Sequence, residues 1–173
     1  FRSIPCLLAL GWLARRLADD TSRALLRSVL ALRLRGDYAA LPQPDTAGQY
    51  YPDDLPRWTN PIRLVDAGAY DGDTLRHLAQ RGYRFERIAA FEPDADNYAR
   101  LVRCLPDFGG GICMPCGLAG TAQQRRFYAT GTGSSQISHI GDAIIQCVSL
   151  DQALPGFQPT LIKMDIEGAE PEA

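Results

Sequence analysis

The spacing of hydrophobic residues changes at residue 62 of this 173-residue chain. In residues 4–35, leucines recur at helical spacing with one interruption, which predicts a hairpin of two helices. Asp20 or Thr21 can cap the second helix, and Gly36 is well placed to end it. The amino-terminal part of the chain is therefore expected to be helical.

Residues 37–61 contain five prolines and little periodicity, which predicts an extended connector. From residue 62 onward, short apolar runs alternate with helical segments. We predict core strands at 62–69, 87–93, 111–118 and 160–166, helices at 74–82 and 94–105, and an inserted hairpin formed by 125–130 and 143–150. This alternation indicates a doubly wound, mostly parallel α/β sheet with the core strands in the order third, second, first, fourth.

The pattern divides the chain into a helical lead (1–36), a connector (37–61) and a sheet domain (62–173). The last predicted strand is followed by only a few residues, so we expect the domain to be truncated after its fourth core strand. A sheet edge left bare in this way would allow self-association with another chain.

Composition and charge narrow the class of protein. Hydrophobic content of 46% and charged content of 22% are typical of a globular protein, and a net charge of −2 gives no reason to expect a nucleic-acid partner. Residues 1–36 carry seven arginines and two aspartates, a charge of +5, which favours a solvated helix face over membrane contact. Residues 4–14 are apolar but too short to span a bilayer, so we expect a buried helix there.

Five cysteines, an odd number, without a secretory signal indicate reduced thiols and a cytoplasmic protein. Cys113 and Cys116 have CxxC spacing, but no second pair follows, and the only histidines are His77 and His139. We therefore expect no metal site.

Two strand ends carry polar residues where ligands bind in such sheets. The first strand runs into a loop in which Gly68 allows a tight turn and Gly72 frees space before a helix that Asp73 or Thr74 can cap. The glycines do not form the GxGxxG dinucleotide fingerprint. Glu92, at the end of the second strand, is placed to accept hydrogen bonds from a ribose diol, or else serves only as a helix cap.

Three motifs together point to a family. DAGAYDGD at 66–73, FEP at 91–93 and IKMDIEGAE at 162–170 resemble the class I S-adenosylmethionine-dependent methyltransferases, and within them the FkbM-type family. The resemblance implies a Rossmann-like fold, S-adenosylmethionine as cofactor, and methylation of a hydroxyl on a sugar, glycolipid or polyketide-like small molecule. It makes 62–173 a methyltransferase domain whose carboxyl-terminal part is missing.

The resemblance also implies cofactor-binding residues. These are Asp66, Gly68, Ala69, Tyr70, Asp71 and Gly72 around the methionine portion, Glu92 and Pro93 at the ribose, and Cys116, Gly117 and Leu118 beside the adenine. Two alternatives stay open, an NAD-binding Rossmann oxidoreductase and a non-catalytic methyltransferase remnant.

The resemblance places Asp165 and Glu167 at the site of methyl transfer. A hydroxyl acceptor needs a base within hydrogen-bond reach, and the candidates are Asp165, Glu167 and His139. Lys163 lies in the same apolar strand, where a lone lysine is unusual. We interpret it as a structural ion pair with Asp66 or Asp165.

Overall fold

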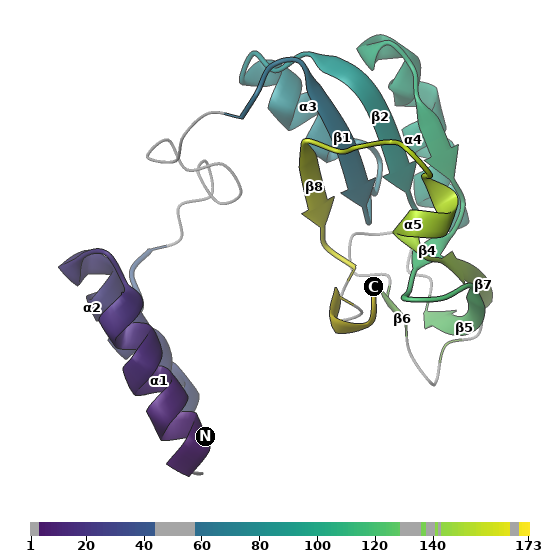
Figure 1. Cartoon of the computed structure of the whole chain (residues 1–173). Coiled ribbons are helices and arrows are strands. Elements are labelled where there is room, and N and C mark those ends of the chain that lie inside the picture. Colours follow the sequence, from purple (N-terminus) through teal and green to yellow (C-terminus); the bar gives the residue numbers. More distant parts are fainter. Residues whose placement is uncertain (1–3, 44–57, 129–135, 138–140, 142, 167–169) are drawn as a thin grey trace. The chain divides into compact units, whose positions relative to one another are not determined.

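The computed structural model describes residues 4–43, 58–128, 136–137, 141, 143–166 and 170–173 (Figure 1). The chain divides into two compact units, Phe1–Pro56 and Arg57–Ala173. Each unit is described by itself below.

The amino-terminal unit contains the expected helical hairpin. Helix α1 spans Ile4–Arg16 and helix α2 spans Asp20–Arg35, followed by the short 3-10 helix η1 at Tyr38–Ala40. The cap of α2 is Asp19, because its carboxylate accepts a hydrogen bond from the Ser22 N–H at 2.7 Å. The prediction of Asp20 or Thr21 as the cap was wrong by one position. Gly36 ends α2 as expected, with φ of 71° and its N–H donated to the Leu32 carbonyl.

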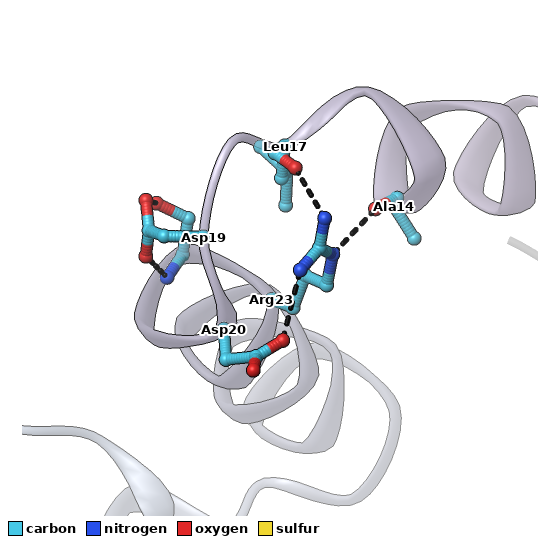
Figure 2. A network of polar contacts seen from close by, with 6 residues as sticks. Ala14, Leu17, Asp19, Asp20 and Arg23 are labelled. Atoms are coloured by element: carbon cyan, nitrogen blue, oxygen red, sulfur yellow. Dashed lines mark hydrogen bonds and ion pairs between the residues drawn. The ribbon is translucent and has the colours of Figure 1, made fainter.

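Arg23 joins the two helices (Figure 2). Its guanidinium donates to the Ala14 carbonyl at 3.3 Å and to the Leu17 carbonyl at 2.7 Å, while also pairing with Asp20 at 2.8 Å. Carbonyls in the last turn of a helix have no partner within the helix. One arginine on α2 therefore satisfies the carboxyl end of α1 and holds the turn of the hairpin.

The expectation of a buried helix at 4–14 was wrong. Leu8 and Trp12 are 68% and 55% exposed, and Trp12 carries the guanidinium of Arg16 over its ring at 4.9 Å from the centroid. Among the described residues, α1 therefore keeps large apolar side chains on an exposed face. No helix in the described part of the chain is long and apolar enough to cross a membrane.

The second unit is built on a four-stranded parallel sheet. Its strands are β1 (Ile62–Ala67), β2 (Phe85–Phe91), β3 (Ile112–Met114) and β8 (Leu161–Met164). Their order is β3-β2-β1-β8, and each neighbouring pair is parallel (Figure 1). This confirms the predicted sheet order, with helices α3 (Asp73–Gln80) and α4 (Ala95–Cys104) in the connections β1–β2 and β2–β3.

The predicted strand 111–118 is in fact two strands in two sheets. β3 stops at Met114, and β4 (Gly117–Leu118) joins a second sheet of order β4-β7-β5-β6. Pro115 lies between them and has no N–H with which to continue the ladder. In the second sheet, β5 (Gln123–Tyr128) and β7 (Ala143–Val148) form the expected antiparallel pair, with β6 at Gln136–Ile137.

One apolar cluster covers one face of the parallel sheet, and further buried apolar residues, among them Leu64, Leu75 and Leu101, belong to the other face and its helices. Val65 and Ala67 of β1 pack with Ala89 and Phe91 of β2, against Phe157 and the short helix α5 (Leu150–Ala153). Alternate residues of a strand point to opposite faces, so Leu64 and Asp66 lie on the other face. Almost every residue of β1 is buried, as is usual for a central parallel strand. The remaining helical turns are η2 (Leu105–Phe108) and η3 (Glu170–Glu172).

Gly68, directly after β1, lies close against the main chain of the segment after β8. It has φ of 71°, and a Cβ built on it would lie 2.0 Å from the carbonyl oxygen of Asp165. We expect Gly68→Ala to lower the free energy of unfolding by about 3 kcal/mol or more, because backbone strain and overlap with a main-chain atom add together. Urea unfolding measures the change.

Gly82→Ala is the matched control, because Gly82 also has a positive φ of 84° but no atom within 4 Å of a built Cβ. It is expected to cost about 1 kcal/mol, the value of the backbone conformation alone. Equal losses in the two variants would show that the close approach to Asp165 has no energetic weight.

Candidate functional site

The loop that follows β1 is folded over the end of β2. The N–H groups of Gly68 and Ala69 both donate to the Phe91 carbonyl at 3.0 Å, and the Gly72 N–H donates back to the Ala69 carbonyl at 2.9 Å. The loop therefore makes a tight turn at the carboxyl edge of the parallel sheet. This is the edge at which open α/β sheets bind ligands.

The far end of the loop is pressed against α4. Gly72 has φ of 87°, and a Cβ on it would lie 2.4 Å from the sulfur of Cys104. Gly72 is itself the cap residue of α3, with no side-chain capping hydrogen bond, so the expected caps Asp73 and Thr74 were wrong. The helix begins without a side-chain cap because the turn at Gly72 already sets its direction.

Glu92 connects the ends of β1 and β2. The residue is only 4% exposed; one carboxylate oxygen accepts the Tyr70 N–H at 2.8 Å and the other the Asp94 N–H at 2.9 Å. The Asn97 amide adds a third hydrogen bond. Burial raises the pKa of Glu92, and these donors oppose the rise. Glu92 does not cap α4; Asp94 does, accepting from the N–H groups of Asp96 and Asn97.

A second buried carboxylate lies on β1. Asp66 is fully buried, and Lys163 is its register partner on β8. The ammonium of Lys163 lies 3.4 Å from Asp66 Oδ1 and donates a hydrogen bond of 2.6 Å to the Gly68 carbonyl. This confirms the structural ion pair and identifies Asp66 as its partner. Lys163 thus holds both the acid and the turn that follows it.

The electrostatics of Asp66 are dominated by its burial. Within the described part of the chain, neither carboxylate oxygen accepts a hydrogen bond of standard geometry. Burial raises the pKa of Asp66 to about 6, although Lys163 and Thr74 act to lower it, and Asp73 adds a further rise. A carboxyl group in this position changes its charge close to physiological pH.

Asp165 follows β8 and belongs to the same edge. Its side chain is exposed, and its N–H donates to the Ala67 carbonyl at 3.1 Å, which brings it beside the loop at Gly68. The other two candidate bases, Glu167 and His139, lie outside the described residues. Glu170 was not predicted as a site residue. Its carboxylate accepts a hydrogen bond from the Ile166 N–H at 2.9 Å.

The segment expected beside the adenine packs into the core. Cys116 and Leu118 are buried in the apolar cluster that also contains Phe91, and Gly117 is buried in β4. The Glu92 N–H donates to the Met114 carbonyl at 3.1 Å, so this segment starts from the same strand end as the acidic loop. Its buried side chains pack in the core beneath that edge of the sheet.

The thiols of Cys113 and Cys116, the CxxC pair, are expected to be unreactive. Burial raises the pKa values of Cys113 and Cys116 to about 11, so both are protonated at neutral pH. Among the described residues, no group of three or more His, Cys, Asp or Glu side chains could hold a metal ion. The thiolate form needed for redox or metal chemistry is therefore strongly disfavoured here.

A family model for the FkbM methyltransferase domain matches residues 66–173, well over half of the chain. The chain belongs to the FkbM methyltransferase family. The matched region begins at Asp66 and takes in the loop after β1, Glu92 and Asp165, the residues that the parallel sheet brings to one edge. The family resemblance and the Rossmann-like fold expected from the sequence are both confirmed.

A solved structure of methyltransferase FkbM from Methylobacillus flagellatus KT is similar to the chain, with a TM-score of 0.74 and 28% sequence identity. The match covers 96% of this chain and 43% of that protein. The 173-residue chain therefore spans less than half the length of that relative. Among curated proteins, none matches the chain.

Asp66 predicts a pH dependence of stability. Its pKa in the fold is about 6, against an ordinary value of 3.8, so folding disfavours the charged form. The contribution of the group to stability is full below pH 3.8 and is lost as the pH rises through 6, a change of about 3 kcal/mol. Because asparagine does not titrate, wild type should lose about this much stability relative to Asp66→Asn between pH 4 and 7.

Urea unfolding of both proteins at several pH values in this range tests the expectation. A stability difference that stays constant with pH would contradict it. The loss of the partner of Lys163 shifts Asp66→Asn by a similar amount throughout, since lysine stays charged over this range, so the slope rather than the offset is diagnostic.

The raised pKa values of Cys113 and Cys116 predict slow alkylation. At pH 8 a thiol with a pKa of about 11 is about 0.1% thiolate, against about a quarter for an ordinary cysteine. Iodoacetamide should therefore label these residues at least about tenfold more slowly in the folded chain than in urea, as followed by peptide mass spectrometry. Equal rates would show that the pair is reactive. Zinc analysis of protein prepared without added metal is expected to find none bound to this pair.

Proposed function

We propose that the protein is an S-adenosylmethionine-dependent O-methyltransferase that acts on a hydroxyl of a sugar, glycolipid or polyketide-like small molecule. The observation that carries the proposal is the buried carboxylate of Glu92 at the carboxyl end of β2, tied to the loop that follows β1 through the Tyr70 N–H. Membership of the FkbM methyltransferase family supports the reaction class.

The residues fit the nucleoside part of the cofactor. An ionised carboxylate offers about four acceptor positions, and three of those on Glu92 are taken by Tyr70, Asp94 and Asn97. We assign the fourth position to a ribose hydroxyl, which donates as these N–H groups do. Pro93 follows directly, and the segment Cys116–Leu118 forms the wall expected to flank the adenine.

The methionine part fits the loop from Asp66 to Gly72. S-adenosylmethionine supplies a methyl group on a positively charged sulfur. The carboxylate of Asp165 offers a negative charge to this sulfur. The turn at Gly68 has no room for a larger residue, because a side chain there would overlap the backbone. The loop positions the cofactor, and the tight turn allows the main chain to approach it closely.

Methyl transfer to a hydroxyl requires alignment and a proton acceptor. Asp165 is exposed at the end of β8, and its main chain is fixed to Ala67. We assign its carboxylate the role of taking the proton of the acceptor hydroxyl, with Glu167 and His139 as the other candidates for that role. The acidic edge also favours the sulfonium charge of the cofactor.

Glu92→Ala tests the cofactor assignment. Hydrogen bonds to a charged group contribute about 1.5 to 3 kcal/mol, so the dissociation constant for S-adenosylhomocysteine should rise about 10- to 150-fold in isothermal titration calorimetry. Glu86→Ala is the matched control, because Glu86 lies on the same strand, is exposed and pairs with Arg63; its affinity should equal that of wild type.

Titration of the wild type with NAD separates the proposal from the oxidoreductase alternative. We expect heat from S-adenosylhomocysteine and none from NAD. Tighter binding of NAD would overturn the proposal. Unchanged affinity in Glu92→Ala would leave Glu92 with a structural role between the two loops.

A further inference from the structure

We propose that Asn97 and Arg100, both on α4, are positioning residues that set the shape of the cofactor site without touching the cofactor. They complete a circuit of four residues, Tyr70, Glu92, Asn97 and Arg100, in which Tyr70 takes part with both its backbone N–H and its ring. The inference rests on the proposed function, because it concerns how the ribose-binding carboxylate and the loop after β1 are held together.

The face of α4 that meets the loop has helical spacing. Asn97, Arg100, Leu101 and Cys104 follow one another at i, i+3, i+4 and i+7, which places them on one face. Leu101 and the Cys104 sulfur lie against Gly72, and the Cys104 thiol donates to the Asp71 carbonyl at 3.3 Å. The carboxyl-terminal part of this face, at Leu101 and Cys104, therefore supports the loop mainly by packing. The amino-terminal part, at Asn97 and Arg100, reaches the loop through polar groups.

Asn97 is the first link in the circuit. It is 1% exposed, and its Oδ1 accepts a hydrogen bond from the Arg100 guanidinium. Arginine has only donors, so the oxygen of the amide must face Arg100 and its NH₂ must face the other way. That NH₂ donates to the carboxylate of Glu92. Arg100 thus fixes which end of the amide the carboxylate meets.

Tyr70 is the second link. The Arg100 guanidinium carbon lies 5.5 Å from the centroid of the Tyr70 ring, within the range of a cation–π contact. The backbone of Tyr70 has φ of 49°, a conformation that non-glycine residues rarely adopt, and its N–H donates to Glu92. The ring and the amide of this residue are therefore held by two different members of the circuit.

Two routes connect Arg100 to Glu92. One runs through the Asn97 amide to the carboxylate, and the other through the Tyr70 ring to the N–H that the carboxylate accepts. A planar guanidinium can donate in its plane to an amide and at the same time present its face to an aromatic ring, which a lysine ammonium cannot do. Arginine, rather than any positive charge, is what the position requires.

The experiment compares Arg100→Met with Arg103→Met, using the full chain. Arg103 lies on the same helix, is exposed and donates to the Ala99 carbonyl, so it controls for the loss of one arginine from α4. We expect Arg100→Met to weaken S-adenosylhomocysteine binding about tenfold, in line with a lost cation–π contact and a loosened hydrogen bond, and Arg103→Met to leave it unchanged. Arg100→Lys should resemble Arg100→Met.

Tyr70→Leu and the double variant show whether the residues act together. If the circuit is real, Arg100→Met in the Tyr70→Leu background should weaken binding by clearly less than it does alone. The acid limb of the binding–pH profile should also move to higher pH in Arg100→Met, because the Asn97 amide, no longer held by Arg100, donates less firmly to Glu92 and lowers its pKa less. A residue with a merely structural role would change neither the coupling nor the pH profile.

Hydrogen exchange of the Tyr70 amide tests the circuit in the absence of any ligand. Exchange should speed up at Tyr70 in Arg100→Met, while the amides of β1 keep their wild-type protection. Unchanged exchange, or effects on affinity that multiply independently, would overturn the inference. No binding of S-adenosylhomocysteine by wild type would overturn the proposed function and this role together. Tight wild-type binding that Arg100→Met leaves intact would overturn this role alone.

Discussion

The carboxyl edge of the parallel sheet depends on one constraint: the carboxylate of Glu92 is buried and must be surrounded by donors. A buried charge without hydrogen bonds is strongly unfavourable, and the donors come from three separate places, the loop after β1, the turn before α4 and α4 itself. The hydrogen bonds to this one side chain thus link three segments that the topology of the sheet places close to one another. The edge has a defined shape because this charge cannot be left unsatisfied.

The same edge contains a second buried carboxylate with the opposite balance. Asp66 has an ammonium beside it but no hydrogen bond of standard geometry among the described residues, and Lys163 gives its shortest bond to the Gly68 carbonyl instead. The lysine is thus shared between an acid and a turn. Glu92 joins β1 to β2 through backbone amides, whereas Lys163 joins β1 to β8 through a side chain.

Much of this architecture follows from local patterns in the sequence, and the exceptions have identifiable causes. Strand–helix alternation predicted the order β3-β2-β1-β8, and the glycine after the leucine-rich segment predicted the end of α2 at Gly36. The split at Pro115 was missed because an apolar run hides the loss of one donor. The exposure of Trp12 was missed because apolar content does not reveal how many partners a helix has. The contacts of Asn97 and Arg100 were missed because they form only once α4 packs against a loop 25 or more residues earlier in the sequence.

The backbone of Tyr70 has a consequence for how this site could be redesigned. A non-glycine residue at φ of 49° stores about 1 kcal/mol of strain, and glycine at the same position would release it. Variants selected only for resistance to heat would therefore tend to replace the tyrosine and discard the ring that Arg100 holds. Under the proposed function, stability and ligand recognition compete at this position, and a screen that rewards only stability would gradually remove ligand recognition.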